Sequence, residues 1–219
     1  MLVDAIPCFS DRSLLRFYLL FWNATVMHQL YLQTYGEGLI LLACTLSRCE
    51  LKLIMDNPMF ESRSPSDFWG RRWNLLVHSV LKNGVFKPVY KYSSRNAAVL
   101  ATFVASGLFH EWLLVSVCAP LPFHLDETGH CRDCFTVVYG AALVFFAWQG
   151  VLVAGELFLG HTEFVQMLSK RLPLPMRTAL IIGMGIPLAH FFNYPYVKSG
   201  FFYHGSIALP MIRRLVVEK

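Results

Sequence analysis

Asn96-Ala-Ala-Val-Leu-Ala-Thr-Phe-Val-Ala-Ser-Gly-Leu-Phe-His-Glu-Trp-Leu-Leu-Val-Ser-Val117 is an apolar run long enough to cross a bilayer as a helix, because such a helix needs about 20 residues. The run contains an ionisable pair, His110 and Glu111. Ionisable side chains at membrane depth cost free energy and usually serve a function. The run therefore predicts a membrane-spanning helix and marks His110 as a candidate functional residue.

The composition of the whole chain agrees with a membrane protein. Of 219 residues, 55% are hydrophobic and only 15% are charged, which is typical of one integral membrane domain over residues 1–219 and excludes an ordinary soluble enzyme. The net charge of +5 is modest, and no nucleic-acid partner is expected. We therefore treat the lipid bilayer as the solvent of this chain.

Hydropathy and charge together predict about four spans, one of them weakened by polar residues and another interrupted by Pro187. Lys and Arg concentrate in 47–95 and 161–177, which predicts that both segments are cytoplasmic. The predicted spans are Leu14–Leu32, Ala97–Cys118, Phe135–Gly160 and Ala179–Val197. The fold class expected is an all-α polytopic bundle with one further interfacial helix.

That interfacial helix is predicted over 64–85, which begins Ser64-Pro-Ser-Asp-Phe-Trp-Gly-Arg-Arg-Trp-Asn74. Serine near its start can cap a helix, and interfacial Trp and Arg commonly anchor helices at lipid headgroups. On a helix, Asn74 and His78 lie one turn apart. Anchoring does not explain Asn74, because an amide beside an apolar run needs a hydrogen-bond partner or a substrate.

Within the strongest span, Phe103, Ser106, Gly107 and His110 share one helix face. Small residues beside His110 would let a substrate chain approach the imidazole. The same small residues also suit close packing between membrane helices. The pattern leaves both interpretations open.

A cysteine-containing loop offers a weak metal motif. His124 and the run His130-Cys-Arg-Asp-Cys134 contain zinc-binding residue types, but a single Cys-x-x-Cys lacks the second pair that makes such a prediction strong. A loop without metal, with or without a disulfide between Cys131 and Cys134, is favoured. We expect no metal and no cofactor.

Two motifs resemble a known family. Phe68-Trp-Gly-Arg-Arg-Trp-Asn74, with Asn57-Pro-Met-Phe60 before it and Gly84-Val-Phe-Lys-Pro88 after it, resembles the wax synthase branch of the membrane-bound O-acyltransferases. Phe103-Val-Ala-Ser-Gly-Leu-Phe-His-Glu111 is similar to that family's histidine helix. The resemblance covers about 56–117. It implies transfer of a long-chain acyl group from acyl-CoA to a fatty alcohol or diacylglycerol, in the endoplasmic reticulum.

The resemblance also implies roles for residues. His110 would be the catalytic base, and Asn74 would orient His110 or the substrate, or stabilise an oxyanion. Burial would keep His110 neutral, and a membrane-enclosed site would exclude the water that hydrolyses thioesters. Basic residues would attract the phosphates of CoA, unless they only set the topology: Arg71, Arg72, Lys82 and Lys87. The residues expected to contact substrate are Phe68, Trp69, Arg71, Arg72, Trp73, Ser106 and Gly107.

Three alternatives stay open. Relatives have more helices before the aromatic motif, so the chain is either a minimal member or an incomplete family domain, and a noncatalytic subunit is the second hypothesis. The third is a small proton-coupled transporter that uses His110, Glu111 and His190. A fungal-type acetyltransferase acting on a terpenoid is a further variant. An enclosed cavity shared by His110 and Asn74 would favour the acyltransferase. Acyl length and oligomeric state are not predicted.

Overall fold

The described parts of the chain are mostly helical. A computed structural model describes residues 11–47, 54–118 and 138–198, and no strand occurs within these ranges. Short π-helical segments cover Phe68–Arg72, Lys82–Phe86 and Leu114–Cys118. The α-helices are α1 Asp11–Ser47, α2 Pro58–Glu61, α3 Pro65–Asp67, α4 Leu75–Leu81, α5 Lys87–Tyr92, α6 Arg95–Leu113, α7 Ala141–Leu159, α8 Glu163–Arg171, α9 Leu174–Gly185 and α10 Ala189–Lys198.

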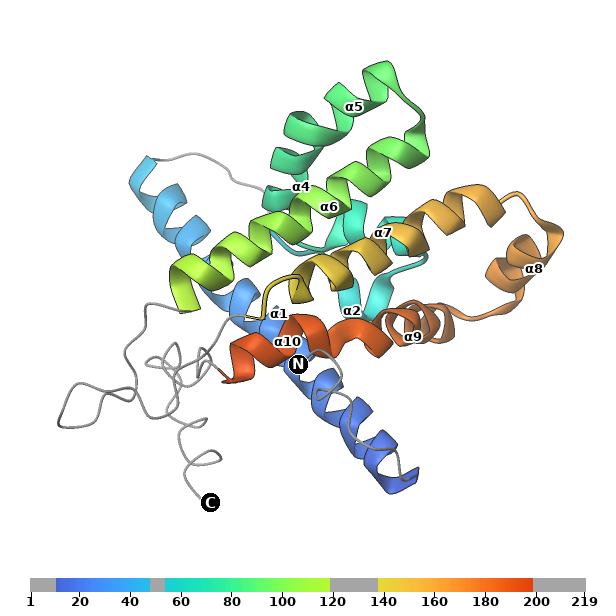
Figure 1. Cartoon of the computed structure of the whole chain (residues 1–219), viewed down its shortest axis with the longest axis horizontal. Coiled ribbons are helices and arrows are strands. Elements are labelled where there is room, and N and C mark those ends of the chain that lie inside the picture. The colour runs from blue at the N-terminus through green and yellow to red at the C-terminus, as the bar shows by residue number, and fades with distance from the viewer. Residues whose placement is uncertain (1–10, 48–53, 119–137, 199–219) are drawn as a thin grey trace.

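Helices α6 and α7 form an antiparallel pair at the centre of the fold (Figure 1). Ser94 caps the start of α6, its side chain accepting from the Ala97 N–H at 3.2 Å. The two helices approach closely at Gly107, where an added Cβ would lie 2.8 Å from the Leu143 Cα. Small residues at such crossings let membrane helices pack by van der Waals contact.

Three helical stretches in the described ranges are long and apolar enough to cross a membrane. They are Arg95–Ser116, Ala141–Leu159 and Leu174–Tyr196, which confirms the three stronger predicted spans. The last is interrupted by a 3₁₀ turn, Ile186–Leu188, at the predicted break around Pro187. Proline causes such breaks because it lacks a backbone N–H. The protein is an all-α polytopic membrane bundle.

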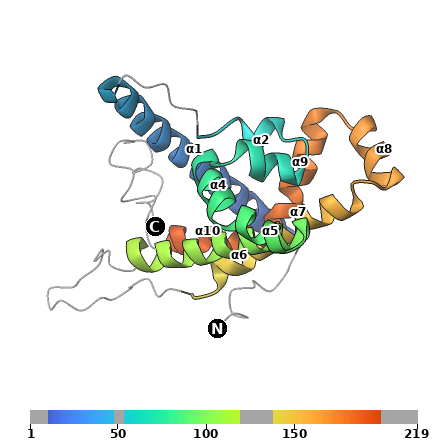
Figure 2. The same cartoon turned by 90° about the horizontal axis from the view of Figure 1, so that it is seen from above.

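Helix α1 is the candidate for the fourth predicted span. It has 37 residues, about 55 Å of helix, which exceeds the roughly 30 Å hydrocarbon core. Its composition is more polar, and it is not among the three helical stretches that are apolar enough to cross a membrane. Figure 1 shows α1 crossing behind the other helices, and Figure 2 shows its C-terminal part extending beyond them. Thr25 and His28, near its middle, contact Asn193 and Phe192 of α10.

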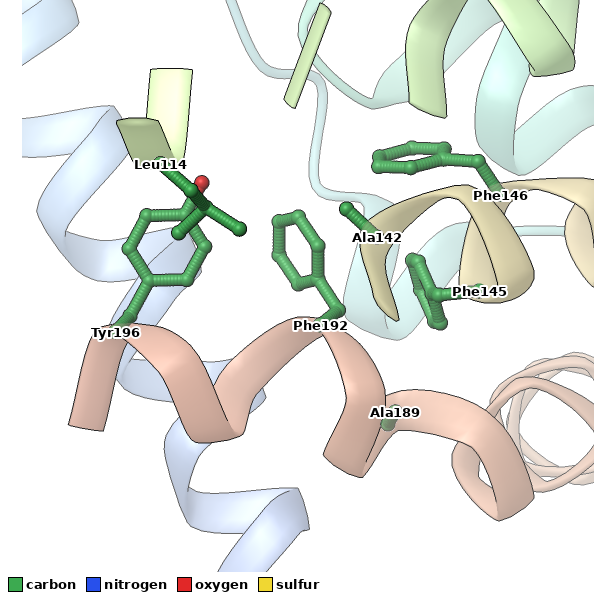
Figure 3. Packing of buried hydrophobic residues seen from close by; sticks show 7 residues of the cluster. All are labelled: Leu114, Ala142, Phe145, Phe146, Ala189, Phe192 and Tyr196. Atoms are coloured by element: carbon green, nitrogen blue, oxygen red, sulfur yellow. The ribbon is translucent and has the colours of Figure 1, made fainter. Parts of the chain in front are cut away.

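The main hydrophobic core lies where α7 meets α10 and the end of α6. Phe145 and Phe146 on α7 pack with Phe192 on α10 at ring-centroid distances of 5.1 and 5.5 Å. Figure 3 shows these side chains converging with Leu114, whose side chain is fully buried. Aromatic pairs at such distances add to the stabilisation from apolar burial. This core forms one wall of the site described below.

The prediction of one continuous helix over 64–85 is wrong, because this segment is broken at Asn74. The chain forms α3, a π-helical segment closed by the Trp73 N–H donating to the Phe68 carbonyl at 2.8 Å, and then a break. At the break, Asn74 has φ 40° and ψ 65°. Asn tolerates this left-handed conformation better than most residues. A second helix, α4, begins at Leu75. The aromatic motif and α4 are therefore two separate helical segments.

The cysteine-containing loop lies outside the described residues. The interpretations offered for Cys131, Cys134 and His124 therefore stay predictions.

Candidate active site

A cavity of about 270 Å³ lies among α1, α4, α6, α7, α9 and α10. His110 and Asn74, from the two separate sequence motifs, both line it. So do four of the residues expected to contact substrate: Phe68, Trp69, Trp73 and Ser106. The fold thus brings the two motifs to one predominantly apolar cavity.

His110 is held in a defined tautomer. Its Nδ1 lies 2.7 Å from the Ser106 carbonyl oxygen, and a carbonyl can only accept, so Nδ1 carries the proton. A neutral imidazole then has its acceptor lone pair on Nε2. The ring stacks on Phe146 at a centroid distance of 4.4 Å and meets the edge of Phe192 at 5.3 Å. The helix backbone and two aromatic rings orient this side chain.

Asn74 ends the aromatic motif and begins α4. Its Oδ1 accepts from the Val77 N–H at 3.2 Å, an N-cap bond that satisfies one of the free donors of a helix start. The cap supplies one partner for the amide that the sequence left unexplained. It also fixes which amide atom is engaged, so the Nδ2 group keeps its two donors.

Trp69 lies at the centre of an aromatic cluster beside the cavity. Its ring is 5.8 Å from Phe103 and 5.9 Å from Phe146, centroid to centroid. Its indole Nε1–H donates to Oε1 of Gln149 on α7 at 3.3 Å. Phe146 therefore lies against both Trp69 and His110, and it joins the aromatic motif to the histidine helix.

A carboxylate on α7 fixes the start of the aromatic motif. Glu156 accepts from the Ser66 backbone N–H at 2.7 Å and from the Ser66 hydroxyl at 2.8 Å. Ser64 caps α3, accepting from the Asp67 N–H at 3.2 Å. A charged acceptor makes both Ser66 bonds strong. Ser66 is thus tied to α7, which carries the cavity wall.

Arg72 does not line the cavity. Its guanidinium pairs with Asp67 at 2.9 Å, Glu61 at 3.1 Å and Asp56 at 3.6 Å. Although burial raises the pKa of Asp67, the Arg63 N–H and the Arg72 guanidinium hold that pKa below its usual value. Arg72 therefore holds the loop around α2 and α3 together.

Two further residues expected to contact substrate also lie outside the cavity lining. Arg71 is exposed, and Gly107 is packed on Leu143. For Gly107, the helix-packing interpretation describes what the structure shows. The physical reason is that Gly107 faces α7, whereas Ser106 and His110 face the cavity.

The remaining groups of the transporter hypothesis have separate roles. Glu111 accepts from the Leu143 N–H at 3.1 Å, in the first turn of α7, where a carboxylate is favoured by the helix dipole. Nδ1 of His190 lies 3.1 Å from the Pro187 carbonyl, and His190 is not among the cavity-lining residues. Neither Glu111 nor His190 is among the residues that line the cavity with His110.

Sequence reasoning did not assign several polar residues of the cavity to the site: Thr25, His28, Arg95, Gln149 and Asn193, and also His78, which it noted only as a neighbour of Asn74. Asn193 Nδ2 donates to the Thr25 hydroxyl at 3.1 Å. Burial and Lys82 lower the pKa of His78. The sequence did contain a signal for Gln149. Like His110, it is a polar side chain within a strongly predicted membrane span. Within 11–47, 54–118 and 138–198, no group of His, Cys, Asp and Glu could hold a metal ion.

Residues 53–136 match the model of the membrane bound O-acyl transferase family. This range contains both motifs and the two residues that converge on the cavity. Over this range the chain is similar to that family.

The chain is also similar to relatives named long-chain-alcohol O-fatty-acyltransferases. It is 28% identical over 160 residues to the probable long-chain-alcohol O-fatty-acyltransferase 3 of Arabidopsis thaliana, covering 69% of this chain and 42% of the relative. It is 31% identical over 139 residues to the probable long-chain-alcohol O-fatty-acyltransferase 9 of Arabidopsis thaliana, covering 60% of this chain and 36% of the relative. It is 40% identical over 63 residues to the long-chain-alcohol O-fatty-acyltransferase of Simmondsia chinensis, covering 25% and 18%.

The chain thus spans less than half the length of these relatives. No solved structure matches it.

Proposed function

We propose that this chain transfers a long-chain acyl group from acyl-CoA to the hydroxyl of a fatty alcohol, forming a wax ester. The observation that carries the proposal is His110 at a largely apolar cavity, its Nδ1 proton held by a backbone carbonyl, with Asn74 lining the same cavity. Relatives named long-chain-alcohol O-fatty-acyltransferases support the choice of reaction.

The reaction needs a base and dry surroundings. Nε2 of His110 takes the hydroxyl proton while the alcohol oxygen bonds to the thioester carbon. The carbonyl π electrons move onto oxygen, and when they return, the carbon–sulfur bond breaks and CoA thiolate leaves. The proton on His110 then passes to that thiolate. Apolar walls exclude water, which would otherwise compete with the alcohol for the thioester.

Charge at the cavity rim suits the CoA moiety. Arg95 lines the cavity and is exposed, and Arg71, Lys82 and Lys87 are exposed on the predicted cytoplasmic side. Arginine and lysine attract phosphate groups. We place the CoA phosphates near Arg95 and the acyl chain within the bundle. The endoplasmic reticulum is the membrane we propose, on family resemblance.

Ester synthesis by membranes that contain the chain tests this proposal. We expect labelled long-chain acyl-CoA and a fatty alcohol to give wax ester above the level of membranes without the chain, with CoA released in equal amount. Diacylglycerol in place of the alcohol should give much less product. Triacylglycerol as the main product would show that diacylglycerol, and not a fatty alcohol, is the preferred acceptor. A well-expressed chain that makes neither ester would favour the noncatalytic-subunit hypothesis.

Asn74→Asp separates the capping role of Asn74 from a role in the reaction. We propose that Nδ2 donates to the alcohol oxygen whose proton His110 removes. Aspartate keeps the acceptor for the Val77 N–H but has no amide donor. We expect thermal stability close to that of the parent and ester formation lowered about 10²-fold, the scale of a lost orienting contact. Full activity in this variant would leave Asn74 as a helix cap alone.

A further inference from the structure

Among the cavity-lining residues that the structure describes, Gln149 has an oriented amide with a buried donor. Its side chain is 4% exposed, and it lies in the middle of α7. Within the described residues, its Nε2 has no hydrogen-bond partner. A buried polar group without a partner costs free energy, so such a group in a cavity calls for a functional explanation.

The orientation of this amide follows from its neighbour. The Trp69 indole Nε1–H can only donate, so the atom of Gln149 facing it at 3.3 Å must be the oxygen, Oε1. Nε2 is therefore the other atom, with two N–H donors. Gly185 lies beside it, since a Cβ added there would be 3.4 Å from Nε2.

The amide is also close to the proposed base in the fold. Gln149 follows Phe146 by one helical turn on α7, and Phe146 stacks on the His110 ring at 4.4 Å. Both Gln149 and His110 line the cavity. A fixed amide donor that needs no reorganisation is the kind of group that stabilises charge developing on an oxygen.

We propose that Gln149 Nε2 donates to the carbonyl oxygen of the acyl group, and that this bond strengthens as the oxygen becomes an oxyanion. This inference rests on the proposed acyltransferase function and adds a residue to it. When the alcohol oxygen bonds to the carbonyl carbon, the π pair moves onto the oxygen facing Nε2. When the carbon–sulfur bond breaks, the pair returns and the ester leaves with a neutral carbonyl. Trp69 is then a positioning residue.

Two unreactive CoA derivatives separate this role from a structural one. One is a ketone in which CH₂ replaces the thioester sulfur, so the carbonyl remains. The other is an S-alkyl-CoA thioether of the same chain length, without a carbonyl. For the parent protein in lipid nanodiscs, we expect the ketone to bind about fivefold more tightly, the scale of one hydrogen bond. In Gln149→Met, this difference should disappear and the rate of ester formation should fall about 10²-fold.

Controls keep the outcomes distinct. Gln166→Met, on the exposed surface of α8, should leave both the binding ratio and the rate unchanged. If Gln149→Met does not fold, Trp69→Phe replaces it: it keeps the amide but removes the bond that orients it, and the ratio should again fall. A ratio unaffected by these changes overturns the role of Gln149 while acyl-CoA binding stands. Failure of the parent to bind either derivative overturns the proposed function as well.

Discussion

His110→Gln is expected to reduce ester formation about 10²- to 10⁴-fold, the range attributed to a general base. Glutamine is close to histidine in size but its amide cannot accept a proton at neutral pH. The change should therefore leave the packing against Phe146 and Phe192 largely in place while removing Nε2 as the base. Initial rates with labelled acyl-CoA and fatty alcohol, at equal expression, measure the effect.

His190→Gln is the matched control for this change. His190 also sits in an apolar span with its Nδ1 near a helix carbonyl, yet it does not line the cavity. We expect its activity to stay within about twofold of the parent. Comparable losses in the two variants would contradict the assignment of the base to His110. Proton-coupled transport that depends on both histidines would instead favour the transporter hypothesis.

Gly107→Val is expected to destabilise the bundle more than any other single change considered. A Cβ at this position would lie 2.8 Å from the Leu143 Cα and 2.9 Å from its Cδ1. Backbone cannot move aside as a flexible side chain can, so α6 and α7 must separate. Overpacking of this kind costs about 1–3 kcal/mol, which corresponds to a fall in Tm of roughly 2–12 °C for a chain of this size.

Gly155→Val is the comparison for that prediction. Gly155 lies on α7, also within a span, but a Cβ added there meets nothing within 4 Å. Thermal unfolding in the same detergent should give a Tm close to that of the parent. If Gly107→Val were equally mild, the small residues of α6 would not determine the approach of the two helices. Ester formation by Gly107→Val above background would then also show that the site tolerates the change.

The spans were predictable because hydropathy is a local property. A run such as 96–117 needs only its own residues to predict a helix in lipid, since every backbone polar group must be satisfied within the segment. The break near Pro187 follows from the missing N–H of proline. The two motifs also pointed to His110 and Asn74, because both carry polar groups that apolar surroundings do not explain.

Side-chain partners were not predictable, because they depend on which helix lies opposite. Arg71 and Arg72 are adjacent and chemically identical, but only Arg72 meets three carboxylates from the surrounding loop. Ser106 and Gly107 are adjacent small residues, but one lines the cavity and the other packs on Leu143. A rotation of about 100° per residue around a helix separates such neighbours, and the sequence does not show what each direction meets.

The sequence by itself determined a helical membrane protein, its three apolar spans, and the two motifs whose histidine and asparagine are the candidate catalytic groups. Those features rest on composition and periodicity within single segments. Tertiary structure alone decided that the motifs meet at one cavity, that Asn74 breaks a helix instead of continuing it, and that Trp69 of the aromatic motif donates to Gln149 of α7. These depend on the packing of α6, α7 and α10, because a hydrogen bond between distant segments forms only when packing brings both partners together.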